Sequence, residues 1–97
     1  MMLSVNKNAK KISRSYNIGV MHRVLDALYE MGRSRPTDIA VYSGLNNQMA
    51  KRYLSLMNLF RWIEIEKEEG HNVICLTETG IFIHNQLHDT MPDEGST

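Results

Sequence analysis

The sequence predicts a small α+β domain that is mostly helical, with a three-helix core, a β-hairpin and a C-terminal helix. Three observations support this prediction. The chain has 97 residues, enough for one domain. Apolar residues recur at helical spacing in several segments between residues 18 and 88, and two β-rich runs flank a set of turn residues between 62 and 76.

The composition changes at both ends of the chain. Residues 1–15 are polar and basic with poor periodicity, and residues 89–97 contain three acids, a proline and a glycine. We therefore expect a flexible basic arm over 1–15, one folded domain over 16–88 and a disordered acidic tail over 89–97.

The first helix is expected from about Ile18 to Met31. Asn17 or Ser15 can cap its start by accepting a backbone N–H, and Gly32 can end it. Its apolar positions follow the spacing that places them on one face: Ile18, Met21, Val24, Leu25 and Leu28.

A short extended link, residues 33–35, leads to a second helix. Arg35 precedes Pro36, and a residue before proline is driven away from helical angles. The second helix is expected over Asp38 to Ser43, with Pro36 and Thr37 at its start and Thr37 as its N-cap. Asp38 then lies in the first turn, where the helix dipole favours an anion.

A tight turn follows at Gly44, Leu45 and Asn46. Glycine accepts the positive φ of such a turn, the leucine can fill the corner between the helices, and Asn46 can cap a third helix, over 47–58. This helix has a buried stripe of Ala50, Tyr53, Leu54 and Met57. A short helix, a tight turn and a longer helix form a helix-turn-helix pattern.

Residues 62–66 alternate between apolar and polar, residues 68–72 contain turn formers, and residues 73–76 are β-rich. These features predict an antiparallel hairpin. Thr77 can cap a last helix that runs to about His88. The whole pattern predicts a winged helix-turn-helix fold.

The exposed face of the third helix suits the major groove of double-stranded DNA. Asn47 and Gln48 can donate and accept together, as adenine requires, while Lys51 and Arg52 can meet guanine or phosphate. The residues expected to bind DNA are Asn46, Asn47, Gln48, Met49, Lys51, Arg52, Ser55, Arg35, Lys10, Lys11 and Arg14. The last three lie in the arm, which can equally be a solvated tail.

The formal net charge is zero, but the charges are unevenly distributed. Residues 1–61 contain ten lysines and arginines against three acids, and residues 62–97 contain one lysine against eight acids. This asymmetry predicts one basic and one acidic face, and DNA would contact the basic one.

Two motifs resemble the archaeal winged helix-turn-helix regulators. Their pattern L-N-x-x-x-x-x-x-Y-L-x-x-L is matched by Leu45, Asn46, Tyr53 and Leu54, with Met57 in place of the last leucine. The family's L-T-x-x-G, which opens its final helix, is matched by residues 76–80. The resemblance covers about residues 14–87 and implies a winged-helix fold, DNA binding through the helix at 47–58 and frequent dimerisation.

The chain departs from that family in its wing. The segment 60–63 is bulkier than the family's G-L-I turn, and the wing contains Glu64, Glu66, Glu68 and Glu69. Phosphates repel such a wing, so contact with the minor groove is doubtful.

The run Ile81-Phe82-Ile83 gives the last helix more apolar surface than one buried stripe needs. In the resembling family the positions of Ile81 and Phe82 are commonly polar. We therefore expect a homodimer interface at Ile81, Phe82, His84 and Leu87.

Other functions have little support in the sequence. His84 and His88 are spaced as a metal-ligand pair, but no third ligand is evident, so we expect two solvated histidines and no metal or cofactor. Cys75, in an apolar strand, is expected to be buried and inert. No catalytic motif, signal peptide or membrane span is found, which favours a cytoplasmic protein that is not an enzyme.

One alternative remains open. Winged helices also serve as protein-binding modules, because a fold does not fix a function. In that hypothesis the acidic half and residues 81–83 would bind a protein within a transcription or viral assembly.

Overall fold

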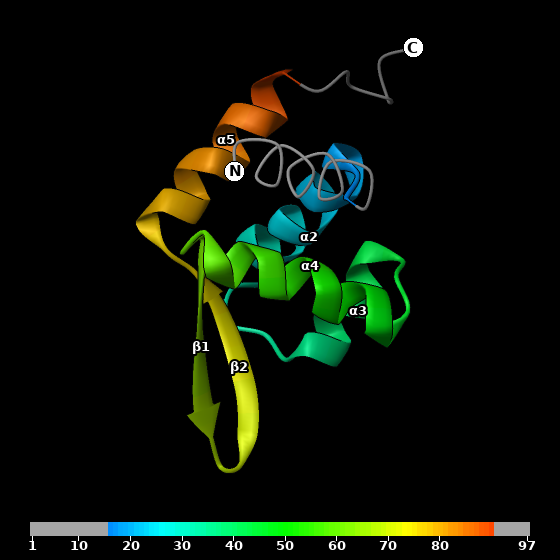
Figure 1. Ribbon diagram of the computed structural model, residues 1–97. Helices are drawn as coiled ribbons and strands as arrows, with labels where there is room; N and C mark the ends of the chain where they lie inside the picture. The colour runs from blue at the N-terminus through cyan, green and yellow to red at the C-terminus, as the bar shows by residue number, and fades with distance from the viewer. Residues whose placement is uncertain (1–15, 91–97) are drawn as a thin grey trace, which may run out of the picture.

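The computed structural model describes residues 16–90, and Figure 1 shows their arrangement. The elements in chain order are α2 (Ile18–Met31), α3 (Pro36–Ser43), α4 (Asn47–Leu59), β1 (Ile63–Glu68), β2 (His71–Leu76) and α5 (Glu78–Thr90). The order and type of every element predicted within residues 16–90 are confirmed, as is the mostly helical α+β class.

The expected cap of α2 is present. The Asn17 side chain accepts a hydrogen bond from the Val20 backbone N–H at 3.1 Å, and Gly32 ends the helix with a φ of 75°. Val24 and Leu25 are fully buried, but Ile18 is 60% exposed. The apolar stripe therefore begins at Met21, which packs against the core, and not at Ile18.

The predicted N-cap of the second helix is wrong. The helix α3 begins at Pro36, and Arg35 occupies the cap position in an extended conformation without a side-chain cap bond. Proline suits the first position of a helix, because its φ is already helical and its missing N–H would be unpaired there. Thr37 consequently lies inside the helix and not before it.

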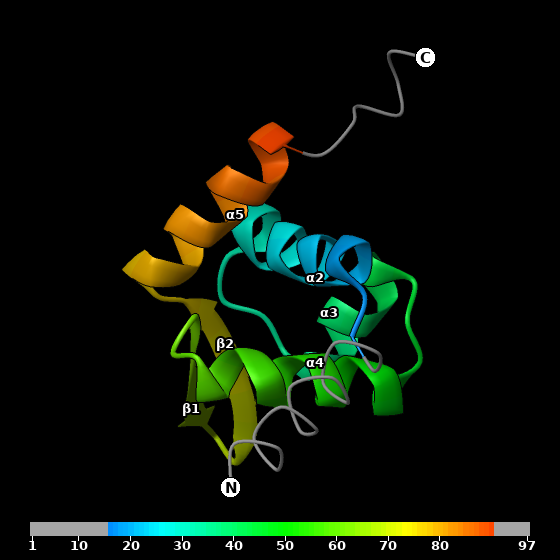
Figure 2. The same cartoon turned by 45° about the horizontal axis from the view of Figure 1, so that its top comes forward.

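The core is built around α2, which contacts α3, α4, α5 and β2 (Figure 2). Side chains from every helix but α5, together with both strands, form one buried cluster: Val24, Leu25, Ala27, Leu28, Ile39, Tyr53, Leu54, Met57, Ile63 and Ile74. Ile83 and Leu87 of α5 pack against this cluster from outside.

The strands β1 and β2 form an antiparallel hairpin, with Ile65 opposite Ile74 and Lys67 opposite Asn72. The link between α2 and α3 joins this sheet at one point: Ser34 donates to and accepts from the Ile74 backbone, at 3.0 Å and 2.8 Å. The link is extended, as predicted, and the hairpin projects away from the helices as a wing (Figure 1).

The last helix is fixed to the start of the hairpin. Thr77 is the predicted cap, and its hydroxyl accepts from the Gly80 N–H at 3.0 Å while it donates to the Arg61 carbonyl at 2.7 Å. The helix ends at Thr90, so the first two residues assigned to the tail, residues 89–90, are helical. Within residues 16–90 no helix is both long and apolar enough to cross a membrane.

Candidate nucleic-acid interface

The turn between α3 and α4 has the predicted chemistry. Gly44 adopts the left-handed conformation, with φ of 71° and ψ of 30°, and its N–H donates to the Val41 carbonyl at 3.2 Å. The next N–H, of Leu45, donates to the Ala40 carbonyl at 2.9 Å, and the Leu45 side chain packs against the core. The turn thereby satisfies the last carbonyls of α3 and redirects the chain into α4.

Asn46 acts as the N-cap of α4. Its side-chain oxygen accepts from the Met49 backbone N–H at 2.7 Å. Ala50, one turn into the helix, is fully buried, and α3 and α4 are in contact. Asn46 therefore fixes where α4 starts and which side chains of its first turns are presented to solvent.

The predicted exposed face of α4 is present. Asn47, Gln48, Lys51, Arg52 and Ser55 are all exposed. These five residues form a surface termed the α4 face. Amides, cations and a hydroxyl thus share one surface of a helix whose opposite side is buried.

Met49 differs from the other predicted contact residues. It is half-buried and packs against the core. Its sulfur lies 3.7 Å from Nη1 of Arg52. Met49 therefore supports the helix and the position of Arg52 more than it offers free apolar surface.

Two aromatic rings, Tyr16 and Tyr53, support Arg52 of the α4 face, and this contact was not predicted from the sequence. The Arg52 guanidinium lies over the ring of Tyr16, 5.4 Å from its centroid. Tyr16 in turn contacts Tyr53 edge-to-face, with 5.1 Å between ring centroids. Only tertiary packing joins Tyr16, just before α2, to Arg52 and Tyr53 in the middle of α4, so no local sequence pattern predicts this contact.

The other predicted basic contacts divide into two groups. Arg35 is exposed and lies directly before α3. Lys10, Lys11 and Arg14 lie outside the described residues. The arm is attached, however, to Tyr16, which packs beside Arg52.

Arg33, in the link between α2 and α3, partly neutralises the acidic charge of the wing. Nη1 of Arg33 lies 2.9 Å from Oε1 of Glu66, and the same guanidinium pairs through Nη2 with Glu68. The hydrogen bond to Glu66 and the charge of Glu68 raise the pKa of Arg33. Arg33 belongs to the basic half of the sequence, but its charge is paired with the wing, whose four glutamates are all exposed.

The expected dimer surface is only partly exposed. Ile81 and Phe82 are 40% and 60% exposed, whereas Leu87 is half-buried against the core. His84 is only 3% exposed, so placing its side chain on an interface was wrong. It faces α2, where its Nε2 lies 2.9 Å from Oδ1 of Asp26.

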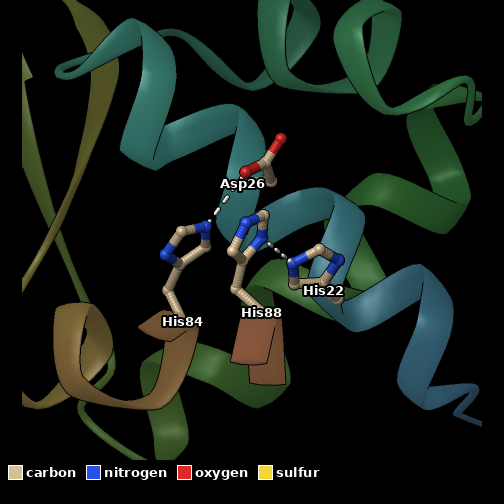
Figure 3. A group of neighbouring side chains, drawn as sticks. All are labelled: His22, Asp26, His84 and His88. Carbon is tan, nitrogen blue, oxygen red and sulfur yellow. Dashed lines mark hydrogen bonds and ion pairs between the residues drawn. The ribbon is translucent and has the colours of Figure 1, made fainter. Parts of the chain in front are cut away.

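The expectation of two solvated histidines is wrong for His84, which is buried, whereas His88 is exposed. His22 and Asp26 from α2 lie beside His84 and His88 from α5 (Figure 3). The spacing i, i+4 on α2 matches that on α5, and this is the signal in the sequence that could have found the group.

No protein-family model matches the chain, and no curated protein matches it. Solved structures do share its fold. Sso10a-2, a DNA-binding protein from Sulfolobus solfataricus, is similar with a TM-score of 0.70 at 18% identity, over 76% of this chain and 76% of that chain. The homodimeric winged helix-turn-helix DNA-binding domain of Mb0332 from Mycobacterium bovis gives a TM-score of 0.66 at 16% identity, over 91% and 82% of the two chains.

A MarR-family transcriptional regulator from Silicibacter pomeroyi gives a TM-score of 0.69 at 14% identity. The match covers 72% of this chain but only 49% of the regulator, so this chain spans about half of that protein. At these identities the likeness shows the fold: the chain is a winged helix-turn-helix domain, as predicted.

Proposed function

We propose that this protein binds double-stranded DNA in a sequence-specific way as a transcriptional regulator, with α4 in the major groove. The observation that carries the proposal is the α4 face, which combines two amides with two cations on the second helix of a helix-turn-helix. The similar solved structures include DNA-binding proteins and transcriptional regulators, which supports the same function.

The chemistry of the α4 face fits base edges. An asparagine or glutamine amide can pair with the N6 and N7 positions of adenine, and arginine or lysine with O6 and N7 of guanine. Asn47 and Gln48 lie in the first turn of the helix, the part that reaches deepest into the groove. Lys51 and Arg52, one turn on, contact guanine or phosphate, with Ser55 beyond them.

Phosphate contacts come from the basic residues around this helix. Arg35 contributes from the start of α3. Tyr16, the first residue that the structure describes, packs against Arg52 of the α4 face. Lys10, Lys11 and Arg14 precede Tyr16 in the sequence. We include these three residues as contacts to phosphate or the minor groove.

The proposed active species is a homodimer that joins through α5. Ile81 and Phe82 offer the exposed apolar surface, and Leu87 continues it toward the core. A symmetric dimer presents two copies of α4 and reads two half-sites about one DNA turn, roughly 34 Å, apart. Such a regulator works in the cytoplasm and needs no catalytic group. The resemblance of its two sequence motifs favours a regulator of the archaeal winged helix-turn-helix type.

The double variant Lys51→Ala/Arg52→Ala tests the role of α4. Binding of a random DNA duplex is measured by fluorescence anisotropy at several salt concentrations. The account expects weaker binding and a salt slope shallower by roughly 2, since each lost phosphate contact removes about 0.9. Unchanged affinity in a folded double variant would contradict it.

A matched control removes two cations outside the proposed contact. Arg61→Ala/Lys67→Ala changes the net charge by the same amount, at the end of α4 and on the wing. The affinity of this control should fall far less than that of the α4 variant. An equal loss in both would indicate general charge attraction without a defined contact helix.

A protein-interaction module is the second candidate function. It is favoured by the exposed acids of the wing and by the exposed apolar side chains of Ile65 and Phe82. Under this alternative, the protein would show no DNA binding at low salt, and a protein partner would be lost on substitution of Phe82.

A further inference from the structure

Four metal-binding side chains from two helices meet at one end of the α2–α5 contact (Figure 3). His22 and Asp26 lie one turn apart on α2, and His84 and His88 lie one turn apart on α5. One ligand atom from each lies within 4.8 Å of the corresponding atom of every other. Each helix thus presents a pair of ligands to the other.

We propose that His22, Asp26, His84 and His88 form a binding site for a divalent transition-metal ion, and that Zn²⁺ fits it best. Three imidazoles and one carboxylate are ligands that zinc accepts, and four ligands complete a tetrahedral site. Hard cations such as Mg²⁺ prefer oxygen ligands and do not suit this set.

Two of the separations between ligand atoms are close to those of a tetrahedral zinc site. With zinc–ligand distances of about 2.0–2.1 Å, neighbouring ligand atoms lie roughly 3.3 Å apart. The Nε2 atom of His84 lies 2.9 Å from Oδ1 of Asp26, and Nδ1 of His88 lies 3.4 Å from Nε2 of His22. All four ligand atoms lie within 4.8 Å of one another, so the two pairs would move closer together around a bound ion.

His84 also has the outer contact that a metal-bound histidine requires. Its Nδ1 lies 3.1 Å from the side-chain oxygen of Asn85, while Nε2 faces Asp26. A neutral imidazole can donate to only one of these two acceptors. A metal ion on Nε2 resolves this, because Nδ1–H then donates to Asn85 and the carboxylate of Asp26 binds the ion.

The cluster is buried at His84 and exposed at His88. Tyr29 covers the ring of His84, with 4.2 Å between ring centroids in a stacked arrangement. The buried His84 therefore anchors the site, and the exposed His88 lies where an ion can enter.

A bound ion would fasten α5 to α2. In this region the two helices are joined by the pair of His84 with Asp26, by the contact of His88 with His22 and by the stacking of Tyr29 on His84. Because α5 also presents Ile81 and Phe82, the ion would hold the proposed dimer surface in one orientation. This consequence depends on the proposed dimer, whereas the metal site itself does not.

The test uses the full chain, first stripped with EDTA, and Zn²⁺ as the only added ligand. Competition with a chromophoric chelator gives the Kd, and thermal unfolding gives the change in Tm. At free zinc about 100-fold above Kd, the Tm should rise by roughly 10 °C or more. Mg²⁺ should produce no rise, and Co²⁺ should give the visible absorption bands of a tetrahedral complex.

Two variants test whether zinc binds at this cluster, and a third controls for zinc binding to other histidines. His88→Gln removes an exposed ligand and should fold normally, and Asp26→Asn removes the carboxylate. Each should weaken zinc binding at least about 10-fold to 100-fold. His71→Gln changes an exposed histidine on the wing, outside the cluster, and should leave the Kd unchanged.

No rise in Tm and no competition with the chelator would overturn the proposal. Equal zinc affinity in wild type, His88→Gln and Asp26→Asn would also overturn it, because zinc would then bind elsewhere. These readouts contain no DNA, so a failed metal site and a failed DNA-binding function are distinguished.

Discussion

The backbone N–H of Asn17 donates to the hydroxyl of Tyr53 at 2.7 Å. This bond joins the residue that caps α2 to the middle of α4, 36 residues along the chain. Tyr53 is only 1% exposed, and its ring supports Tyr16, over which Arg52 lies. Tyr53 thus links the start of α2 to the proposed recognition helix and supports the side chain of Arg52 on its exposed face.

Tyr53→Phe should lower the free energy of unfolding by about 1–3 kcal/mol, because the Asn17 N–H loses its partner. Urea unfolding measures this loss. Tyr29→Phe, which removes a hydroxyl from an exposed tyrosine of α2, should change stability by less than about 0.5 kcal/mol. Equal stability of the two variants would contradict a structural role for the Tyr53 hydroxyl.

Gly80→Ala should destabilise the fold by about 1–3 kcal/mol or more, as overpacking does. A Cβ at this position would clash with the backbone oxygen of Trp62, so α5 would have to shift. Thermal unfolding reports the loss, and Thr79→Ala, at the exposed neighbour, is the control. If Gly80→Ala were as stable as Thr79→Ala, this result would contradict the close contact between Gly80 of α5 and the backbone of Trp62.

Phe82→Glu should convert the proposed dimer to a monomer, because a charge would be placed in an apolar contact. Sedimentation measures the mass, and the variant should keep its helical circular dichroism. Leu59→Glu makes the same change at another exposed apolar residue, 72% exposed at the end of α4, and should leave the dimer intact. A wild-type protein that is monomeric at high concentration would contradict the interface.

Cys75 should react slowly with alkylating reagents in the folded protein. Burial raises the pKa of its thiol, and the charges of Glu66 and Glu64 raise it further, while Arg33 lowers it. A raised pKa leaves less thiolate at neutral pH, and the thiolate is the reactive form. The reaction should accelerate in urea, and a native rate equal to the unfolded rate would contradict this environment.

Local features of this fold were predictable from the sequence. The caps at Asn17, Asn46 and Thr77 and the turn at Gly44 depend on residues within a few positions, so the local sequence specifies them. The start of α3 was missed because proline at the first helical position outweighed the preference for a Thr37 cap.

Long-range features were not predictable in the same way. The ion pairs of Arg33 with Glu66 and Glu68 link residues more than thirty positions apart. His84 faces Asp26 across 58 positions. Such contacts depend on how α2 packs against the wing and α5, which the periodicity of single segments does not specify.

The most direct test of the central proposal, DNA binding, is an anisotropy titration of random duplex DNA with the wild-type protein across a salt series. The account predicts binding at low salt and a linear fall of log K with log salt concentration, since phosphate contacts release counterions. A steep slope would show several such contacts and would justify selecting a specific site. Absence of binding even at low salt would contradict the proposal and favour a protein partner.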